Sequence, residues 1–252
     1  MNTITRSIVE MRGVNKSFHG VRALDDVDFT VGVGEVVGLL GDNGAGKSTL
    51  IKILTGFLKA DTASIRIDGV DHQFRNPQEA RNAGVETVYQ EQALADDLSV
   101  ARNLFLGKEL VRKVGPFRLL DDGRMRRESE EMLRDLRLAV DPDKPARDCS
   151  GGERQGICIA RAIHFEAKLV ILDEPTNALG VAAVKRVLDL IRDLKARGIA
   201  VIFIGHNLYE VLEVADRAVV MVRGKKVVDV ATRDTSVGEL TELLMQRSGI
   251  GG

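Results

Sequence analysis

The feature that most limits the possible folds is a strand-like run that leads directly into a glycine-rich turn and then into a helix-like segment. The apolar run covers residues 36–40, the turn residues 41–46, and the helical pattern residues 47–58. The run is continuous rather than alternating and contains β-branched valines, which is typical of a parallel strand covered on both faces. A strand followed at once by a helix predicts an α/β fold.

Two further apolar runs support this interpretation. Residues 169–172 and 199–204 have the same character, and between them residues 181–195 carry apolar side chains at helical spacing. The N-terminal part differs, because glycine-containing turns separate its short strand patterns. These patterns cover residues 8–14, 23–31 and 64–68. We therefore expect a small, mostly antiparallel sheet beside a larger parallel one.

The glycine-rich turn matches the pattern G-x-x-x-x-G-K-[ST] at Gly41, Gly46, Lys47 and Ser48. Such a loop binds phosphate, because its backbone N–H groups and the start of the helix surround phosphate oxygens. Lys47 then neutralises the β- and γ-phosphates, and the Ser48 hydroxyl binds Mg²⁺. A chance match is on the order of one in a hundred. The predicted nucleotide contacts are Gly41, Asp42, Asn43, Gly44, Ala45, Gly46, Lys47, Ser48 and Thr49.

Two acids, Asp173 and Glu174, end the apolar run 169–172. A buried strand brings its terminal carboxylates to the carboxyl edge of the sheet, where ligands of open α/β folds bind. We expect Asp173 to hold Mg²⁺, directly or through water, and Glu174 to orient and deprotonate the attacking water. A solvated strand end is the alternative, and the neighbouring phosphate loop makes it the poorer interpretation.

The remaining composition is that of an ordinary folded protein. The formal net charge of 252 residues is −1, which gives no electrostatic signature of nucleic-acid binding. Cys149 and Cys158 form no C-x-x-C pair, so neither a disulfide framework nor a zinc site is expected. No apolar run approaches the length of a membrane helix. Residues 94–162 lack long apolar runs and read as a helical insertion, with a charged helix over about 123–138.

The segment from Cys149 to Gln155 makes the interpretation specific. Together with the phosphate loop and the acid pair, it resembles the L-S-G-G-Q signature of ABC-type ATPases. The resemblance implies a P-loop NTPase (RecA-like) core with an N-terminal antiparallel β subdomain and an inserted α-helical subdomain. It divides a single domain of residues 1–252 into a core of about 1–93 and 163–252 and a helical part of about 94–162. The signature residues would contact ATP held by another subunit: Ser150, Gly151, Gly152 and Glu153.

Three more residues take roles from this resemblance. Gln90 matches the glutamine that binds Mg²⁺, senses the γ-phosphate and signals to a membrane partner. His206, which follows the run 199–204, matches the switch histidine that contacts the γ-phosphate. Phe18 matches the aromatic residue that stacks on adenine, with a core phenylalanine as the alternative. The implied catalytic set is Glu174, His206 and Gln90, and the implied metal set is Ser48, Gln90 and Asp173.

One subgroup of the family is the most similar. Residues 74–90, 103–107 and 178–181 look like the ATPases of bacterial monosaccharide importers of the ribose, xylose and fructose kind. The resemblance implies an ATP-hydrolysing subunit with ATP and Mg²⁺, paired head to tail as a homodimer. It also implies contact with a separate integral membrane permease through the region near Gln90–Ser99, and an indirect link to a sugar-binding protein. Such a subunit lies peripherally on the cytoplasmic face of the inner membrane and binds no nucleic acid.

The chain departs from the family pattern at four positions. Cys149 and Glu153 replace Leu and Gln of the signature, and we expect Glu153 to point away from the phosphate. Gly180 stands where many relatives have an aspartate, and Gly205 replaces the usual serine before the switch histidine. We expect Gly205 to loosen its turn, because glycine has the most backbone freedom.

Other functions remain open at this point. An ABC-type ATPase of an exporter, or of an importer for another solute, has the same ATP chemistry. A non-transport ABC ATPase acting on nucleic acid or on protein assembly is less favoured, because no long coiled-coil insertion or second copy is present. A nucleotide-responsive regulatory module fits poorly, because few residues follow His206.

Overall fold

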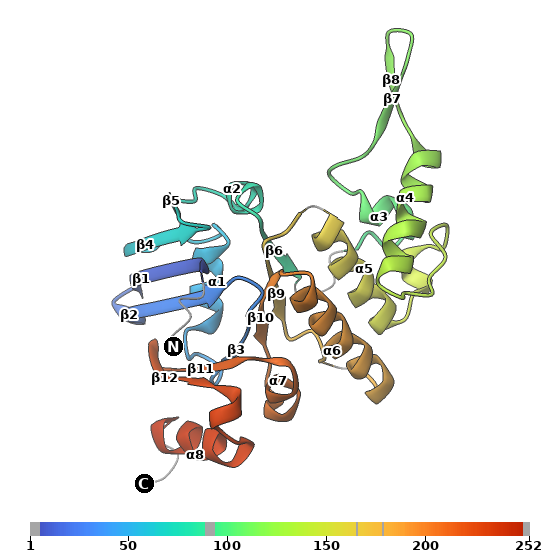
Figure 1. Cartoon of the computed structure of the whole chain (residues 1–252). Helices are drawn as coiled ribbons and strands as arrows, with labels where there is room; N and C mark the ends of the chain where they lie inside the picture. Colours follow the sequence, from blue (N-terminus) through green and yellow to red (C-terminus); the bar gives the residue numbers. More distant parts are fainter. Residues whose placement is uncertain (1–5, 89–93, 165, 178, 249–252) are drawn as a thin grey trace.

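The computed structural model describes residues 6–88, 94–164, 166–177 and 179–248. Its centre is a six-stranded sheet in the order β12-β11-β3-β10-β9-β6 (Figure 1). Five neighbouring strands run parallel, and β12 joins the edge antiparallel to β11. The strands are β3 Val36–Leu40, β6 Val85–Val88, β9 Leu169–Asp173, β10 Ala200–Ile204, β11 Arg217–Val222 and β12 Lys225–Ala231.

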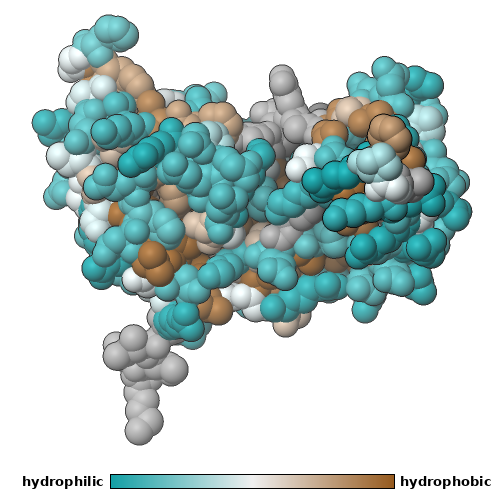
Figure 2. All heavy atoms as spheres, turned by 90° about the horizontal axis from the view of Figure 1, so that it is seen from above, coloured by the Kyte–Doolittle hydropathy of each residue, from teal (hydrophilic) through white to brown (hydrophobic). Residues whose placement is uncertain are grey.

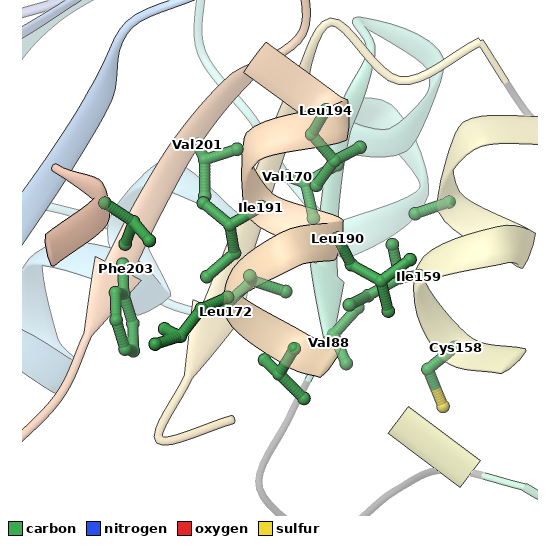
Figure 3. Close-up of a cluster of buried hydrophobic side chains, with 14 of the residues drawn as sticks. Val88, Cys158, Ile159, Val170, Leu172, Leu190, Ile191, Leu194, Val201 and Phe203 are labelled. Atoms are coloured by element: carbon green, nitrogen blue, oxygen red, sulfur yellow. The ribbon is translucent and has the colours of Figure 1, made fainter. Parts of the chain in front are cut away.

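Both faces of this sheet are buried, which explains why its strands read as continuous apolar runs. Val170 and Leu172 belong to one apolar cluster, and Leu169 and Ile171 of the same strand belong to a second cluster. Figure 3 shows the first cluster between β9, β10 and the helices packed on them. Phe203 is fully buried there, and burial of such a side chain contributes roughly 1.5–3 kcal/mol.

Different elements cover the two faces. The helices that contribute buried residues to the first cluster include α5 Gly151–His164, α6 Val181–Ala196, α7 Leu208–Val214 and α8 Val237–Ser248. The second cluster combines α1 Lys47–Leu54 with the N-terminal sheet. That sheet is antiparallel, in the order β2-β1-β4-β5, as the sequence predicted. Its elements are β1 Ser7–Phe18, β2 Val21–Gly32, β4 Thr62–Ile67 and β5 Val70–His72, with α2 Pro77–Asn82 following.

The insertion forms a lobe beside the core (Figure 1). It contains α3 Val100–Leu104, α4 Asp122–Asp135 and the short helix η1 Ala146–Asp148, and α5 packs against both α3 and α6. A two-stranded hairpin also belongs to it, with strands β7 Val111–Val114 and β8 Phe117–Leu120. The sequence predicts a helical insertion here, and the hairpin corrects that prediction. The division of the domain near residues 94 and 162 remains a prediction.

Some element ends differ from those expected. The first helix stops at Leu54 rather than 58, because Gly56 has a left-handed backbone with φ 73°. The strands β11 and β12, the short helix η2 Thr232–Asp234 and α8 were not anticipated. None of the helices in the described ranges is long and apolar enough to cross a membrane.

Candidate active site

Three chain segments that carry the predicted phosphate-binding and catalytic residues leave the parallel sheet at one edge. Ile204 of β10 pairs with Leu39 of β3 and with Asp173 of β9. The phosphate loop follows β3, the acid pair ends β9, and His206 follows β10. The parallel register therefore brings together the three groups that the sequence analysis assigned to one site.

The phosphate loop holds its lysine close to the backbone. Lys47 is buried, and its Nζ donates to the carbonyl oxygens of Gly41 at 2.5 Å and Asp42 at 3.0 Å. Burial lowers the pKa of Lys47, while the carboxylates of Glu174, Asp42 and Asp173 act to raise it. A cation held this way is available to a phosphate that replaces the loop carbonyls as its partner.

The start of the loop allows no side chain at Gly41. Its φ is 142°, and an added Cβ would lie 2.3 Å from the carbonyl oxygen of Met221. Gly46 N-caps α1 in a left-handed conformation with φ 103°. Much of the loop is open to solvent, because Asp42, Asn43, Gly44 and Ser48 are exposed, while Thr49 is half-buried and Ala45 buried.

The acid pair carries an unfavourable concentration of negative charge. Burial, followed by repulsion from Glu174, raises the pKa of Asp173, and the charge of Lys47 counteracts this rise. The charges of His206 and Lys52 act in the same direction as Lys47. A divalent cation beside Asp173 would relieve this repulsion and favour its charged form.

Glu174 is fixed by contacts on both carboxylate oxygens. Its Oε1 is in hydrogen-bond contact with His206 Nε2, and its Oε2 accepts from Asn177 Nδ2 at 3.2 Å. Its backbone has φ 50°, and its N–H donates to the Ile204 carbonyl at 2.9 Å. Asn177 is not among the residues predicted from the sequence, where its signal is an amide three residues after the candidate base.

The donor set fits magnesium. Within the described part of the chain, no three His, Cys, Asp or Glu side chains gather as a metal site. Magnesium suits such a site, because it is usually bound through one or two carboxylates together with phosphate oxygens and waters. Asp173 offers a carboxylate and Ser48 an exposed hydroxyl.

The signature segment forms the start of α5. The Ser150 N–H donates to Glu153 Oε2 at 2.6 Å, and the Glu153 N–H donates to Ser150 Oγ at 3.3 Å. This reciprocal pair is a capping box. Lys144 Nζ lies 3.5 Å from the same carboxylate oxygen. Burial acts to raise the pKa of Glu153, but the bonds from Ser150 and the charge of Lys144 outweigh it and lower that pKa.

Two other departures from the family pattern also have structural explanations. Cys149 is buried and belongs to the first apolar cluster, so it occupies an apolar position, like the leucine that it replaces. Gly205 is buried, and an added Cβ would lie 3.2 Å from Val211 Cγ2 and 3.3 Å from Phe203 Cε2. The expectation of a looser turn is therefore replaced by one of tight packing, in which glycine saves space.

The structure bears on the assignment of Phe18 but not on that of Gln90. Phe18 is 41% exposed, which removes the alternative of a core phenylalanine, and Lys16 Nζ lies 5.5 Å from its ring centroid. Gln90 lies outside the described residues. Its roles in catalysis and metal binding therefore stay predictions.

A turn far along the sequence supports the phosphate loop. The Gly224 N–H, between β11 and β12, donates to the Ala45 carbonyl at 3.0 Å, and the Gly224 carbonyl accepts from the Asp25 N–H at 2.9 Å. An added Cβ on Gly224 would lie 2.7 Å from the Ala23 carbonyl oxygen. An added Cβ on Gly46 would lie 2.8 Å from the same oxygen. No sequence pattern predicts this support.

We expect Gly224→Ala to weaken ATP binding about tenfold, because misplacement of a binding loop by a fraction of an ångström lowers affinity steeply. The new methyl group must push Ala23 or the turn away, and either movement shifts the backbone at Ala45. The dissociation constant of a fluorescent ATP analogue measures this effect, and thermal unfolding measures the cost to stability.

Gly69→Ala is the matched control. Gly69 also has φ 79°, but an added Cβ there meets no atom within 4 Å. Both variants therefore carry the same backbone strain, and only Gly224→Ala carries the displacement. Equal ATP affinities in the two variants would contradict the proposed support of the loop.

The comparisons with known proteins agree with this site. The family described as ABC transporter matches residues 24–177. A xylose/arabinose import ATP-binding protein of Sulfolobus acidocaldarius is 43% identical over 238 residues, 94% of this chain and 93% of that protein. A fructose import ATP-binding protein of Rhizobium meliloti is also 43% identical, over 92% of this chain and 91% of that protein. The predicted resemblance to sugar-import ATPases is thereby confirmed.

Two further matches define the architecture. A ribose import ATP-binding protein of Rubrobacter xylanophilus is 42% identical over 96% of this chain, and this chain spans about half (48%) of its length. The solved ADP conformation of an ATP-binding cassette has a TM-score of 0.80 at 27% identity, covering 98% of this chain and 99% of that one. The predicted fold class is confirmed, and the chain belongs to the ABC transporter family, as one of its ATP-binding cassettes.

Proposed function

We propose that this chain is the ATP-hydrolysing subunit of a monosaccharide importer and transmits the energy of hydrolysis to a separate membrane permease. The observation that carries the proposal is the shared edge of β3, β9 and β10, which joins a phosphate loop, an acid pair and a histidine. The sugar class rests on relatives that are named as xylose/arabinose and fructose import proteins and are 43% identical over nearly the whole chain.

The chemistry follows from the geometry. Lys47 exchanges its two carbonyl partners for the β- and γ-phosphates of ATP, and the loop N–H groups surround the phosphates. Ser48, Asp173 and Gln90 would hold magnesium, which would offset the negative charge that develops on the phosphates. Glu174, oriented by His206 and Asn177, orients the attacking water and accepts its proton. Phe18 stacks on the adenine ring.

The complete site requires a second copy of the chain. Ser150 and the glycines after it start a helix, and a helix start attracts phosphate through its backbone N–H groups and partial positive charge. In the proposed homodimer, this helix start of one chain meets the ATP on the loop of the other chain, while the Glu153 carboxylate points away from the phosphate and accepts from the Ser150 N–H. A solved cassette is described as dimeric with ADP and Pi, and it shares this fold at a TM-score of 0.74.

The permease is proposed to bind the lobe near Gln90–Ser99, of which residues 94–99 are described. We propose that the chain lies peripherally on the cytoplasmic face of the inner membrane. A sugar-binding protein outside the membrane would select the sugar, so this chain would never touch it. ATP binding closes the dimer, and hydrolysis reopens it.

Affinity purification from membranes, followed by reconstitution in lipid vesicles, tests this function. We expect an integral permease to accompany the chain, and at least one of ribose, xylose or fructose to stimulate ATP hydrolysis severalfold in the presence of its binding protein. An amino acid serves as the control solute, and excess EDTA gives the baseline without magnesium. A complex stimulated only by an exported compound or another solute, or a chain without any integral partner, would overturn the import proposal.

A further inference from the structure

The hairpin β7–β8 projects from the lobe between α3 and α4 (Figure 1). Its base is fixed, because the Asp121 N–H donates to the Leu110 carbonyl at 2.8 Å. Both strands are exposed along the part described, and Phe117 at the turn is 69% exposed. A two-stranded hairpin alone in water is marginally stable. This projection therefore exposes apolar surface that the fold itself does not cover.

Both faces of the hairpin combine apolar and basic side chains. Val111 pairs with Leu120, and Lys113 pairs with Arg118, so these four share one face. Arg112 pairs with Leu119, which lies with Phe117 on the other face. A rigid protein groove would cover one of these faces. A medium that surrounds the hairpin would bury apolar groups on both.

The hairpin itself contains no acid. Residues 111–120 have three basic residues and no Asp or Glu, in a chain whose net charge is −1. The nearby acids are engaged elsewhere: Glu109 accepts from the Gly107 N–H, and Asp122 pairs with Arg102. Lys113 and Arg118 stand directly opposite each other, which is destabilising for like charges without an anion beside them.

We propose that the hairpin docks on an anionic lipid surface, with the ring of Phe117 among the acyl chains and Lys113 and Arg118 at the phosphate headgroups. An apolar tip with a collar of basic side chains matches the depth profile of such an interface. Figure 2 looks down on the side from which the hairpin projects and shows apolar atoms bordered by hydrophilic ones there. The hairpin belongs to the same lobe as residues 94–99, which are proposed to face the membrane permease. This inference therefore rests on the proposed position of the chain at a membrane.

Flotation of the full chain with vesicles, without permease or sugar, tests the inference. Vesicles of phosphatidylcholine and phosphatidylglycerol in a ratio of 3:1 are compared with pure phosphatidylcholine over a series of salt concentrations. We expect binding to the anionic vesicles that weakens as salt is added, because salt screens the headgroup charge. Lys113→Ser/Arg118→Ser should weaken binding about tenfold or more, and Phe117→Ser should weaken it at all salt concentrations.

Two controls make the outcome decisive. Arg127→Ser/Arg134→Ser removes two exposed positive charges from α4, and Met245→Ser removes an exposed apolar side chain from α8. Both should bind vesicles like the original chain. All variants should keep its ATP hydrolysis in solution, which shows that they fold and separates this test from that of the importer function. Equal binding to neutral vesicles, equal losses in the controls, or a hairpin effect that appears only with permease present would overturn the lipid assignment.

Discussion

Glu174→Gln should slow ATP hydrolysis by about 10²–10⁴-fold, the usual contribution of one general base, while ATP still binds. The amide keeps the size of the side chain and can still accept a bond at its oxygen, but it cannot take a proton from water. Glu174 is held by His206 and Asn177 at the edge of the sheet, so its position is set before ATP arrives. Single-turnover hydrolysis and the ATP dissociation constant measure the two effects separately.

Glu166→Gln is the matched control for this substitution. Glu166 also has a left-handed backbone, with φ 57° against 50° for Glu174, but it is exposed after α5. The Glu166→Gln variant should hydrolyse ATP at the rate of the unsubstituted chain. Turnover close to normal in Glu174→Gln would remove the assigned role, and weakened ATP binding would show that the carboxylate mainly shapes the site.

The same contacts assign a smaller role to Asn177. Its amide reaches the carboxylate oxygen that His206 leaves free, and it is therefore a positioning residue for Glu174. Sequence reasoning identified Glu174 because phosphoryl transfer requires a group to orient and deprotonate water. It missed Asn177, because an amide becomes informative only once its partner atom is located.

Sequence patterns identified the strands of the site because these strands are covered on both faces. Consecutive residues of β9 enter opposite apolar clusters, so almost every position must be apolar. The hairpin β7–β8 gave no such pattern, because both of its faces are exposed and each strand has four residues. Gly115 and Pro116 were the available turn signal.

The phosphate loop itself was readable from local sequence, but its support was not. Ala45 receives the Gly224 N–H from a turn almost 180 residues away, and no local pattern records such a contact. The signature segment is the opposite case, because its explanation is local. Glu153 looked like a departure from the family pattern, and the structure explains it locally as the partner of Ser150 in a capping box.

That capping box allows a sharp test of the shared site. Ser150→Asp keeps an N-cap side chain but adds a negative charge where the γ-phosphate of the partner chain is expected. Lys47→Ala removes the buried cation of the loop. Each variant alone should lose nearly all hydrolysis, because both sites of each homodimer then contain one defective half.

Mixing the two variants should restore activity, because a mixed dimer contains one site with an intact loop and an intact signature. Random pairing makes half of the dimers mixed, so hydrolysis should reach about a quarter of the original rate if the two sites act independently. Ser150→Asn keeps the cap without the charge and should remain active alone. Size-exclusion chromatography, which detects the dimers that form when ATP is added, gives a second measurement that does not require turnover. If the mixture neither hydrolyses ATP nor forms dimers, the two defects do not complement each other between chains, each loop does not use Ser150 of a partner chain but needs that of its own, and the homodimer proposal fails.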